Sequence, residues 1–172
     1  MTNSRLTLAT HALCWLEYWW QQESVSVTSA RLAESLSSNP VTIRKVLAGV
    51  RDAGLVRAGR GPGSGWRLAQ PATDITLLDV YQALGEKGPF ELHRNAPDYS
   101  CPVGGGVGES MERVYAAAER QMLLVLASVT ISSLLDDILR VNQGGKSEVD
   151  SLLGHFASPL PHDLGRPVKL VN

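Results

Sequence analysis

Cysteine is scarce in this sequence, because its 172 residues include only Cys14 and Cys101. Two thiols cannot form a disulfide framework or a metal site that is built from several thiolates. The four histidines are scattered along the chain, and no two of them lie four residues apart. The sequence therefore predicts neither a metal site nor a bound cofactor.

Long apolar runs are missing as well. No stretch approaches the roughly eighteen apolar residues of a membrane span, and the first five residues lack the basic-then-apolar order of a secretory signal. Apolar residues still make up 44% of the chain and charged residues 19%, which is enough to bury a core. We therefore expect a soluble, cytoplasmic protein that does not bind membranes.

The sequence also offers no set of catalytic residues. No Ser/His/Asp set and no pair of carboxylates stands out, so an enzyme is the least expected class of protein. The glycine-rich segment 59–65 contains no lysine and lies between two predicted strands. A phosphate-binding loop needs Gly-Lys-Ser/Thr in front of a helix, so this segment is not predicted to bind a nucleotide.

The net charge of −1 hides an uneven distribution of charge. Residues 1–70 carry eight Lys and Arg against four acids, and residues 71–172 carry eight against thirteen. Between Ser37 and Gln70, six basic residues stand against one acid. A basic part of this kind is what a protein needs in order to contact phosphates.

Three helices are predicted in the basic part. The first spans 6–22 and is apolar around about half of its circumference, so we expect it to pack between two surfaces. A short second helix spans 29–35. The third begins at Pro40 and ends at Gly54, and its apolar residues share one face while its basic residues point elsewhere. Two helices joined by a tight polar turn are typical of a helix-turn-helix.

Two short strands, 55–58 and 66–69, follow the third helix. The glycine-rich loop between them predicts a hairpin, which is the wing of a winged helix-turn-helix. The expected fold class is therefore mainly α with a small β-hairpin (α+β): a winged helix-turn-helix domain followed by a long C-terminal dimerisation helix.

The acidic part is predicted to be helical as well. A short helix spans 76–84, with Asp79 completing a capping box, and a loop rich in Gly and Pro covers 85–106. Apolar residues then recur at 107, 111, 114, 118, 122, 125 and 129, the spacing of a long helix with a seam for a partner helix. A last helix begins after Thr130. We divide the chain into a DNA-binding domain (1–72), a connecting and dimerisation part (73–144) and a weakly ordered tail (145–172).

The third predicted helix holds the strongest candidates for DNA contacts. Thr42, Arg44 and Lys45 lie near its N-terminus, the part of such a helix that reaches base edges in the major groove. Arg60 in the wing loop suits a narrow minor groove, which attracts arginine. The complete set of candidate DNA-binding residues adds phosphate contacts and the wing serine: Ser29, Arg31, Ser38, Thr42, Arg44, Lys45, Arg60 and Ser64.

Both thiols are candidates for redox sensing. Cys101 lies in a Gly- and Pro-rich loop where a reagent can reach it. Cys14 lies off the apolar stripes of its helix, so we expect it to be accessible or to meet a partner chain. Most lone intracellular cysteines are inert, and that interpretation remains open for each.

Three segments together resemble the IscR/NsrR/CymR ("Rrf-two") family of bacterial transcription regulators. These segments are Ala53-Gly54-Leu55-Val56, then Arg60-Gly61-Pro62-Gly63-Ser64-Gly65-Trp66-Arg67-Leu68-Ala69, and then Asp74-Ile75-Thr76-Leu77-Leu78-Asp79-Val80. The Cys101-Pro102-Val103-Gly104 loop and the long helix after it are similar too, so that the resemblance covers about residues 5 to 140.

The resemblance implies a homodimer that is held by the long helix and binds a palindromic operator in double-stranded DNA. By position, Thr42, Arg44 and Lys45 would read bases and Arg60 would be the wing arginine. Iron–sulfur members hold their cluster with three cysteines in the loop before the long helix, where this chain has only Cys101. The sequence therefore resembles the cluster-less, YwnA-like branch, in which some members respond through thiols.

We therefore expect a homodimeric, sequence-specific DNA-binding regulator, a repressor without a cluster, that responds to an oxidant or electrophile. One alternative is a winged-helix regulator that responds to a small molecule in an apolar pocket between the first helix and the long one. Another is a protein–protein adaptor that does not bind DNA.

Overall fold

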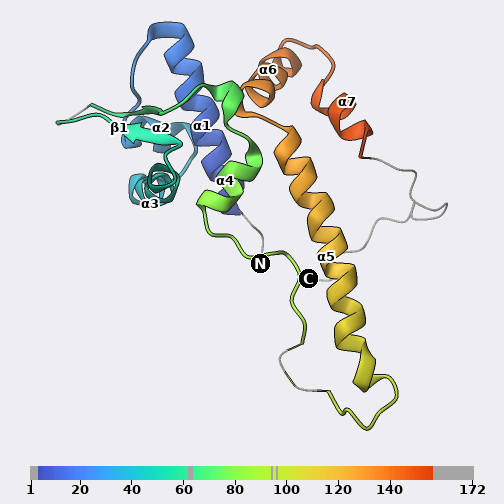
Figure 1. The fold of residues 1–172 in the computed structure, drawn as a ribbon. Coiled ribbons are helices and arrows are strands. Elements are labelled where there is room, and N and C mark those ends of the chain that lie inside the picture. The colour runs from blue at the N-terminus through green and yellow to red at the C-terminus, as the bar shows by residue number, and fades with distance from the viewer. Residues whose placement is uncertain (1–3, 62–63, 94, 96, 157–172) are drawn as a thin grey trace.

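The protein is described here by a computed structural model, which covers residues 4–61, 64–93, 95 and 97–156. Seven α-helices and one two-stranded antiparallel sheet make up this part of the chain (Figure 1). The expected fold class, mainly α with a small β-hairpin, is confirmed. In chain order the elements are α1 (Ser4–Glu23), α2 (Ser29–Ser35), α3 (Pro40–Asp52), β1 (Val56–Ala58), β2 (Trp66–Leu68), the 3-10 turn η1 (Ala72–Asp74), α4 (Leu77–Ala83), α5 (Gly104–Ser128), α6 (Ile131–Asn142) and α7 (Val149–Gly154).

Helix α1 lies at the centre of the globular part. It contacts α3 and β2 on one side and α4 and α6 on the other. Leu13 and Leu16 are fully buried, and Ala9 and Ala12 allow neighbouring elements to approach closely. This confirms that the broad apolar surface of the helix packs between two surfaces. Burying a leucine side chain of this kind stabilises the fold by about 1.5–3 kcal/mol.

Local capping interactions fix where the helices of the helix-turn-helix begin. The side chain of Thr28 accepts a hydrogen bond from the backbone N–H of Arg31 at the start of α2. At the start of α3, the Asn39 side chain accepts one from Val41 N at 2.8 Å, and Pro40 follows at the first helical position. Helix α3 stops before Gly54, whose φ is +78°. These ends agree with the sequence-based predictions.

The β-hairpin is anchored at its base to the segment between α1 and α2. Val56 and Leu68 form a pair across the strands and face the core, and Val27 exchanges two backbone hydrogen bonds with Trp66. Gly65 has a φ of +68°, and a Cβ at this position would lie 2.8 Å from the backbone of Val27. Glycine is therefore required at the base of the wing, both for its conformation and for space.

The two halves of the chain are joined by a short backbone pairing that lies between two capping boxes. In one, Thr76 and Asp79 cap α4; in the other, Thr130 and Ser133 cap α6. Between the two boxes, Leu77 N donates to Val129 O and Ile131 N donates to Ile75 O, both at 2.9 Å. This short backbone pairing attaches the end of α5 to the start of α4.

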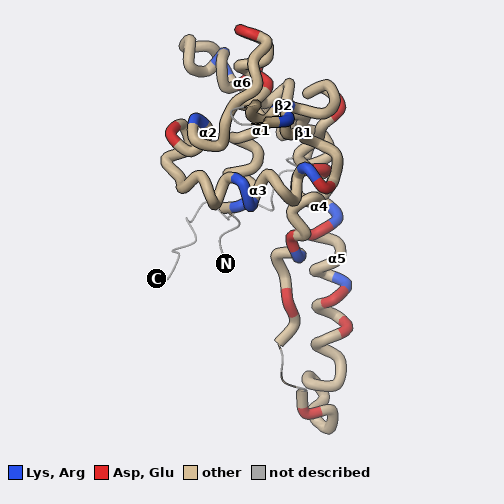
Figure 2. Tube along the Cα trace, turned by 90° about the vertical axis from the view of Figure 1, so that its left-hand side faces the viewer, with Lys and Arg blue, Asp and Glu red and all other residues tan. Residues whose placement is uncertain are grey.

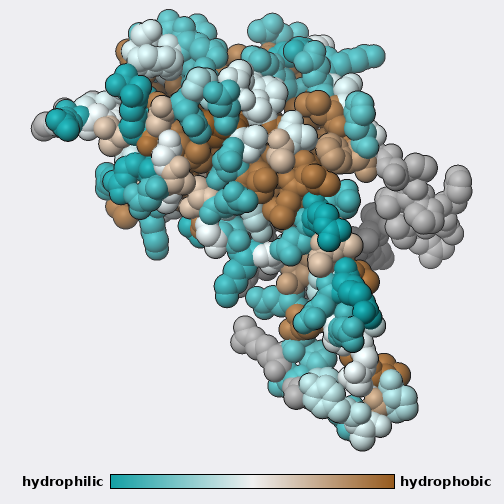
Figure 3. Space-filling model, in the orientation of Figure 1, coloured by the Kyte–Doolittle hydropathy of each residue, from teal (hydrophilic) through white to brown (hydrophobic). Residues whose placement is uncertain are grey.

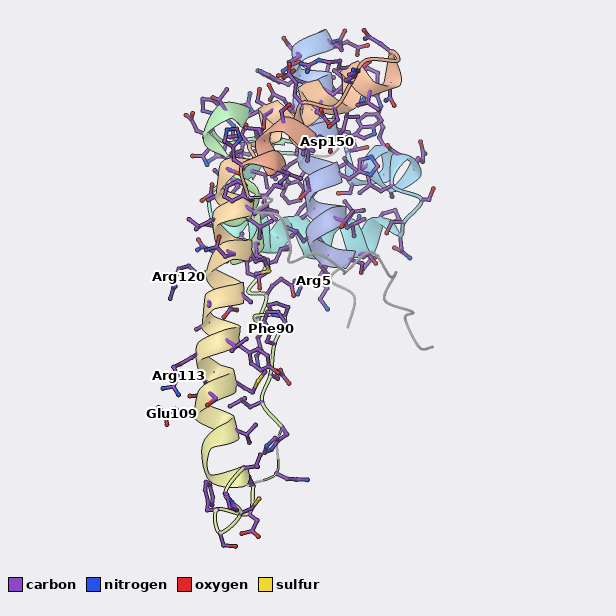
Figure 4. The ribbon with its side chains drawn as sticks, turned by 90° about the vertical axis from the view of Figure 1, so that its right-hand side faces the viewer. Arg5, Phe90, Glu109, Arg113, Arg120 and Asp150 are labelled. Carbon is purple, nitrogen blue, oxygen red and sulfur yellow. The ribbon has the colours of Figure 1, made fainter. Side chains whose placement is uncertain are left out.

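Helix α5 extends well away from the globular part, and the described residues of the segment before it, 86–93 and 97–103, run antiparallel along it (Figures 1 and 4). Phe90 stacks on Tyr115 of α5 with ring centroids 4.9 Å apart. The helix begins at Gly104, earlier than the predicted residue 107. Gly105 N and Val107 N already donate to Cys101 O and Val103 O, so the helical hydrogen bonds extend into the glycine run.

The segment 145–172, predicted to be weakly ordered, contains the short helix α7. Asp137 of α6 holds its start, because Asp137 Oδ1 accepts hydrogen bonds from Glu148 N (2.6 Å) and Val149 N (3.2 Å) and Oδ2 accepts one from Ser147 Oγ. Burial alone raises the pKa of Asp137, but these hydrogen bonds outweigh it and lower the pKa below its usual value. The rest of the predicted tail, residues 157–172, lies outside the described residues. None of the described helices is long and apolar enough to cross a bilayer.

The buried face of α3 provides a test of the packing. Leu47 is 0% exposed and Val41, on the same helix, is 62% exposed. We expect Leu47→Ala to lower the free energy of unfolding by about 2–5 kcal/mol, because it leaves a cavity in the core. The control Val41→Ala is expected to change it by less than about 0.5 kcal/mol. Urea unfolding followed by circular dichroism measures both, and equal midpoints for the two variants would contradict the packing described here.

Candidate nucleic-acid interface

The N-terminal half of α3 presents a polar, basic surface to solvent. Ile43, Val46, Leu47 and Val50 are buried, so that Thr42, Arg44 and Lys45 are left exposed. In Figure 2 the N-terminal half of α3 carries one continuous basic stretch along the tube. A helix docked in the major groove uses its first turns in this way to reach base edges.

Arg44 and Lys45 are available for an external anion. In the described part of the chain neither side chain has a carboxylate within ion-pairing distance. Arg51, near the end of the same helix, differs because its Nη2 lies 2.8 Å from Asp52 Oδ1. The unpaired positive charge of α3 is therefore concentrated toward its N-terminal half, the end where the helix dipole also favours anions.

Two of the candidate phosphate contacts already have partners within the protein. Trp66 Nε1 donates a hydrogen bond to Ser29 Oγ at 3.0 Å, which joins α2 to the base of the wing. The Arg31 guanidinium lies over the Trp19 ring at 3.8 Å, and Trp15 stacks on Trp19 with centroids 5.1 Å apart. Such a cation–π contact fixes the arginine side chain. Ser38, in the turn, is half-buried, and its backbone N–H donates to Ala33 O.

The wing loop carries Arg60 into solvent. Arg60 is exposed, and the loop is closed by a hydrogen bond from Gly59 N to Gly65 O at 2.9 Å. Ser64 Oγ donates to Gly61 O at 2.8 Å, so this hydroxyl stabilises the loop instead of pointing outward. Residues 62 and 63 lie outside the described part of the chain. Arg44, Lys45 and Arg60 thus lie on adjacent elements of the winged helix, with Arg60 on the wing.

One exposed residue on α3, Val41, was not among the predicted site residues. Val41 is 62% exposed although it is apolar, and it occupies the second position of the helix. Helical spacing places residues 41, 44 and 45 on one face, so the periodicity could have identified it. An exposed apolar side chain at this position suits contact with a thymine methyl group.

The two cysteines differ in exposure. The expectation that Cys14 is accessible is wrong: it is 4% exposed in the core, and burial raises the pKa of its thiol to about 12. The side of α1 that carries Cys14 is covered by other elements, which the periodicity of this single helix could not reveal. Cys101 is exposed just before α5, and hydrogen bonds from the N–H groups of Gly104 and Val103 lower the pKa of its thiol below its ordinary value.

Comparison with known proteins gives a consistent result. The family model described as Rrf2, iron-dependent transcriptional regulator, matches residues 2–137. YwnA of Bacillus subtilis, named as an HTH-type transcriptional regulator, is 30% identical over 140 residues, which cover 80% of this chain and 99% of YwnA. Among solved structures, T. potens IscR has a TM-score of 0.61 at 20% identity, with 80% of this chain and 88% of that chain covered. Staphylococcus aureus CymR has a TM-score of 0.59 at 19% identity, with 77% and 96% covered.

The family description includes iron, so the available ligands have to be considered. Of the two thiols, Cys14 is buried within α1 and Cys101 is exposed before α5. Within the described residues no three His, Cys, Asp or Glu side chains come together as metal ligands. These residues do not fit an iron–sulfur cluster held by several thiolates.

The match over most of the chain and the similarity to YwnA establish the family. Its members are transcriptional regulators and not enzymes, and the winged helix with an exposed basic face agrees with DNA binding. The chain belongs to the Rrf2 family of transcriptional regulators.

Proposed function

We propose that the protein is a homodimeric repressor that binds a palindromic operator with two winged helices and acts in the cytoplasm. The observation that carries this proposal is the exposed pair Arg44 and Lys45, unpaired among the described residues, on the outer face of a helix whose other face is buried. Arg44 is suited to a guanine and Val41 to a thymine methyl group, while Lys45 contacts a base or a phosphate.

The wing and the start of α2 complete the contact with DNA. Arg60 enters the minor groove beside the half-site, where a narrow A·T tract attracts a guanidinium. Because several cations neutralise phosphates, affinity for DNA falls steeply as the salt concentration rises. Ser29, Arg31, Ser38 and Ser64 contribute chiefly by holding the helix-turn-helix and the wing in place, and the edge of the Arg31 guanidinium can still meet a phosphate.

The homodimer is supported by the surface of α5. This helix has 25 residues and none of them is buried in the single chain. Val114, on the predicted seam, is 57% exposed, and Leu124 is 49% exposed. Figure 3 shows hydrophobic side chains gathered where α5 meets the globular part. A second copy of α5 would cover this seam, and two-fold symmetry would match a palindromic site.

Arg44→Ala tests the contact with DNA. We expect the variant to lose about 1–3 kcal/mol of binding free energy and to discriminate less at one operator position, because a bidentate contact to one base is removed. Fluorescence anisotropy with DNA from upstream of the protein's own gene measures the affinity.

Arg113→Ala is the matched control, since it removes the same charge from the exposed side of α5 (Figure 4). Equal affinity and an equal footprint for Arg44→Ala and the parent protein would contradict the role of Arg44.

Val114→Glu tests the dimer. A carboxylate on the seam would have to be buried between two helices, so we expect the variant to be largely monomeric and to bind its operator much more weakly. Light scattering after size-exclusion chromatography measures the mass, and Arg113→Glu, on a neighbouring face of α5, should remain dimeric. A dimeric Val114→Glu variant would rule out this seam.

For the signal, we propose that an oxidant or electrophile reacts with Cys101. This thiol is exposed and its pKa is lowered, whereas Cys14 is buried and its pKa is raised. The thiolate is the reactive form, so a lowered pKa makes Cys101 reactive at a lower pH than an ordinary thiol.

The pH dependence of alkylation tests this assignment. The rate at which Cys101 displaces iodide from iodoacetamide should rise with pH, with a midpoint lower in the folded protein than in the urea-unfolded protein. Cys14→Ser isolates this thiol, and Cys101→Ser should abolish labelling of the folded protein. Mass spectrometry follows the reaction. Equal midpoints in the two states would refute the activation of Cys101.

A further inference from the structure

A cleft of about 530 Å³ lies between the C-terminal part of α1 and the β-hairpin, and its lining residues include none from α3. Its volume falls in the range of small-molecule sites. The segment after β2 and the start of α6 complete its walls. The side chains that matter for its chemistry are Trp20, Arg57, Arg67, Gln70, Thr73 and Ser132. It is a different place from the pocket predicted between the first helix and the long one.

Two arginines give this cleft its charge. Arg57 of β1 and Arg67 of β2 are directly opposite each other in the antiparallel register, and both line the cleft. Opposite residues of this kind have Cβ atoms about 4.5–5.5 Å apart, and like charges there destabilise a hairpin. Within the described residues neither guanidinium has a carboxylate within ion-pairing distance. An anion bound between the two guanidinium groups would relieve this repulsion.

One acid lines the cleft together with these arginines. Glu17 also lines the cleft, and its Oε1 accepts a hydrogen bond from Gln21 Nε2 at 2.9 Å. It forms no ion pair with Arg57 or Arg67. Two guanidinium groups against one carboxylate leave the cleft with an excess positive charge, while Gln70, Thr73 and Ser132 supply neutral polar groups.

Trp20 adds an aromatic surface beside the arginines. The side chain is 39% exposed, and the Arg67 guanidinium lies 5.4 Å from the centroid of its ring. A tryptophan in a cleft offers a flat apolar face for a planar molecule. Its neighbour Arg67 can bind a carboxylate or a phosphate through two parallel hydrogen bonds.

We propose that this cleft binds a small planar organic anion, an aromatic ring that bears a carboxylate or a phosphate group. Arg57 and Arg67 hold the anionic group, and Trp20 contacts the ring. Because one wall belongs to the wing and the others to α1 and α6, a ligand here contacts both the DNA-binding hairpin and the body of the protein. The role of this ligand as an effector rests on the proposed DNA-binding function. Its binding to the cleft does not depend on that function.

An effect on DNA binding requires a difference in affinity. The ligand changes the affinity for the operator only if the cleft differs between the free and the DNA-bound protein, and the operator then changes the affinity for the ligand by the same factor.

The test is calorimetric titration of the full-length protein with benzoate, phenyl phosphate and benzamide. We expect saturable binding of one anion per chain. Neutral benzamide should bind at least about tenfold more weakly than the anions. The comparison between benzoate and phenyl phosphate identifies the preferred anionic group. Arg57→Gln and Arg67→Gln should each weaken anion binding about tenfold or more, and Trp20→Leu should weaken it as well.

Arg113→Gln is the control, because it removes an exposed guanidinium on α5 and should bind the anions as the parent does. Circular dichroism confirms that each variant is folded. The site is refuted if neither anion saturates, if benzamide binds as well as benzoate, or if both arginine variants bind the anions normally. If the arginine variants bind the operator more weakly and the parent protein binds neither anion, Arg57 and Arg67 are DNA contacts. This outcome would likewise refute the site.

Operator binding is measured in parallel, with and without benzoate, and separates the two proposals. If the protein binds the operator but no anion, the proposed function stands and the anion site in the cleft is refuted. If the protein binds the anion through Arg57 and Arg67 but does not bind the operator, the anion site stands and the proposed function is refuted.

Discussion

The burial of α1 is the constraint on which the rest of the structure depends. Because Leu13 and Leu16 need neighbours on more than one side, α3 and the hairpin are held on one side of the helix and α4 and α6 on the other. A fully buried apolar face on α3 follows, and its polar residues are left at the surface. The exposed basic face is thus a direct consequence of how the core is filled.

Much of the fold could be predicted from local signals. Thr28, Asn39 and Thr76 cap helices that begin within one residue of the predicted starts, and Gly54 ends α3 with a positive φ. Helix caps and glycine stop signals depend on a few neighbouring residues, so they can be predicted from a single sequence. Helix α7 was missed because its start is held by Asp137, which lies eleven and twelve residues before the two backbone N–H groups that it binds.

The candidate site was only partly predictable, because some of its contacts join residues that are far apart in the sequence. The exposure of Arg44 and Lys45 follows from the period of one helix, and it was predicted correctly. The hydrogen bond from Trp66 to Ser29 spans 37 residues, and the Arg31 guanidinium meets Trp19 from another helix. The burial of Cys14 likewise depends on several elements at once. Such contacts arise from tertiary packing, which periodicity does not encode.

The glycines of the wing are not equivalent, although both Gly61 and Gly65 have a positive φ. At Gly61, whose φ is +94°, no described residue lies within 4 Å of the place a Cβ would take, so a side chain there meets backbone strain but no neighbour. At Gly65 the backbone of Val27 fills that place. A library of wing sequences built on this scaffold should therefore keep residue 65 fixed, because any side chain there would separate β2 from the body of the protein, whereas a substitution at residue 61 would strain only the loop itself.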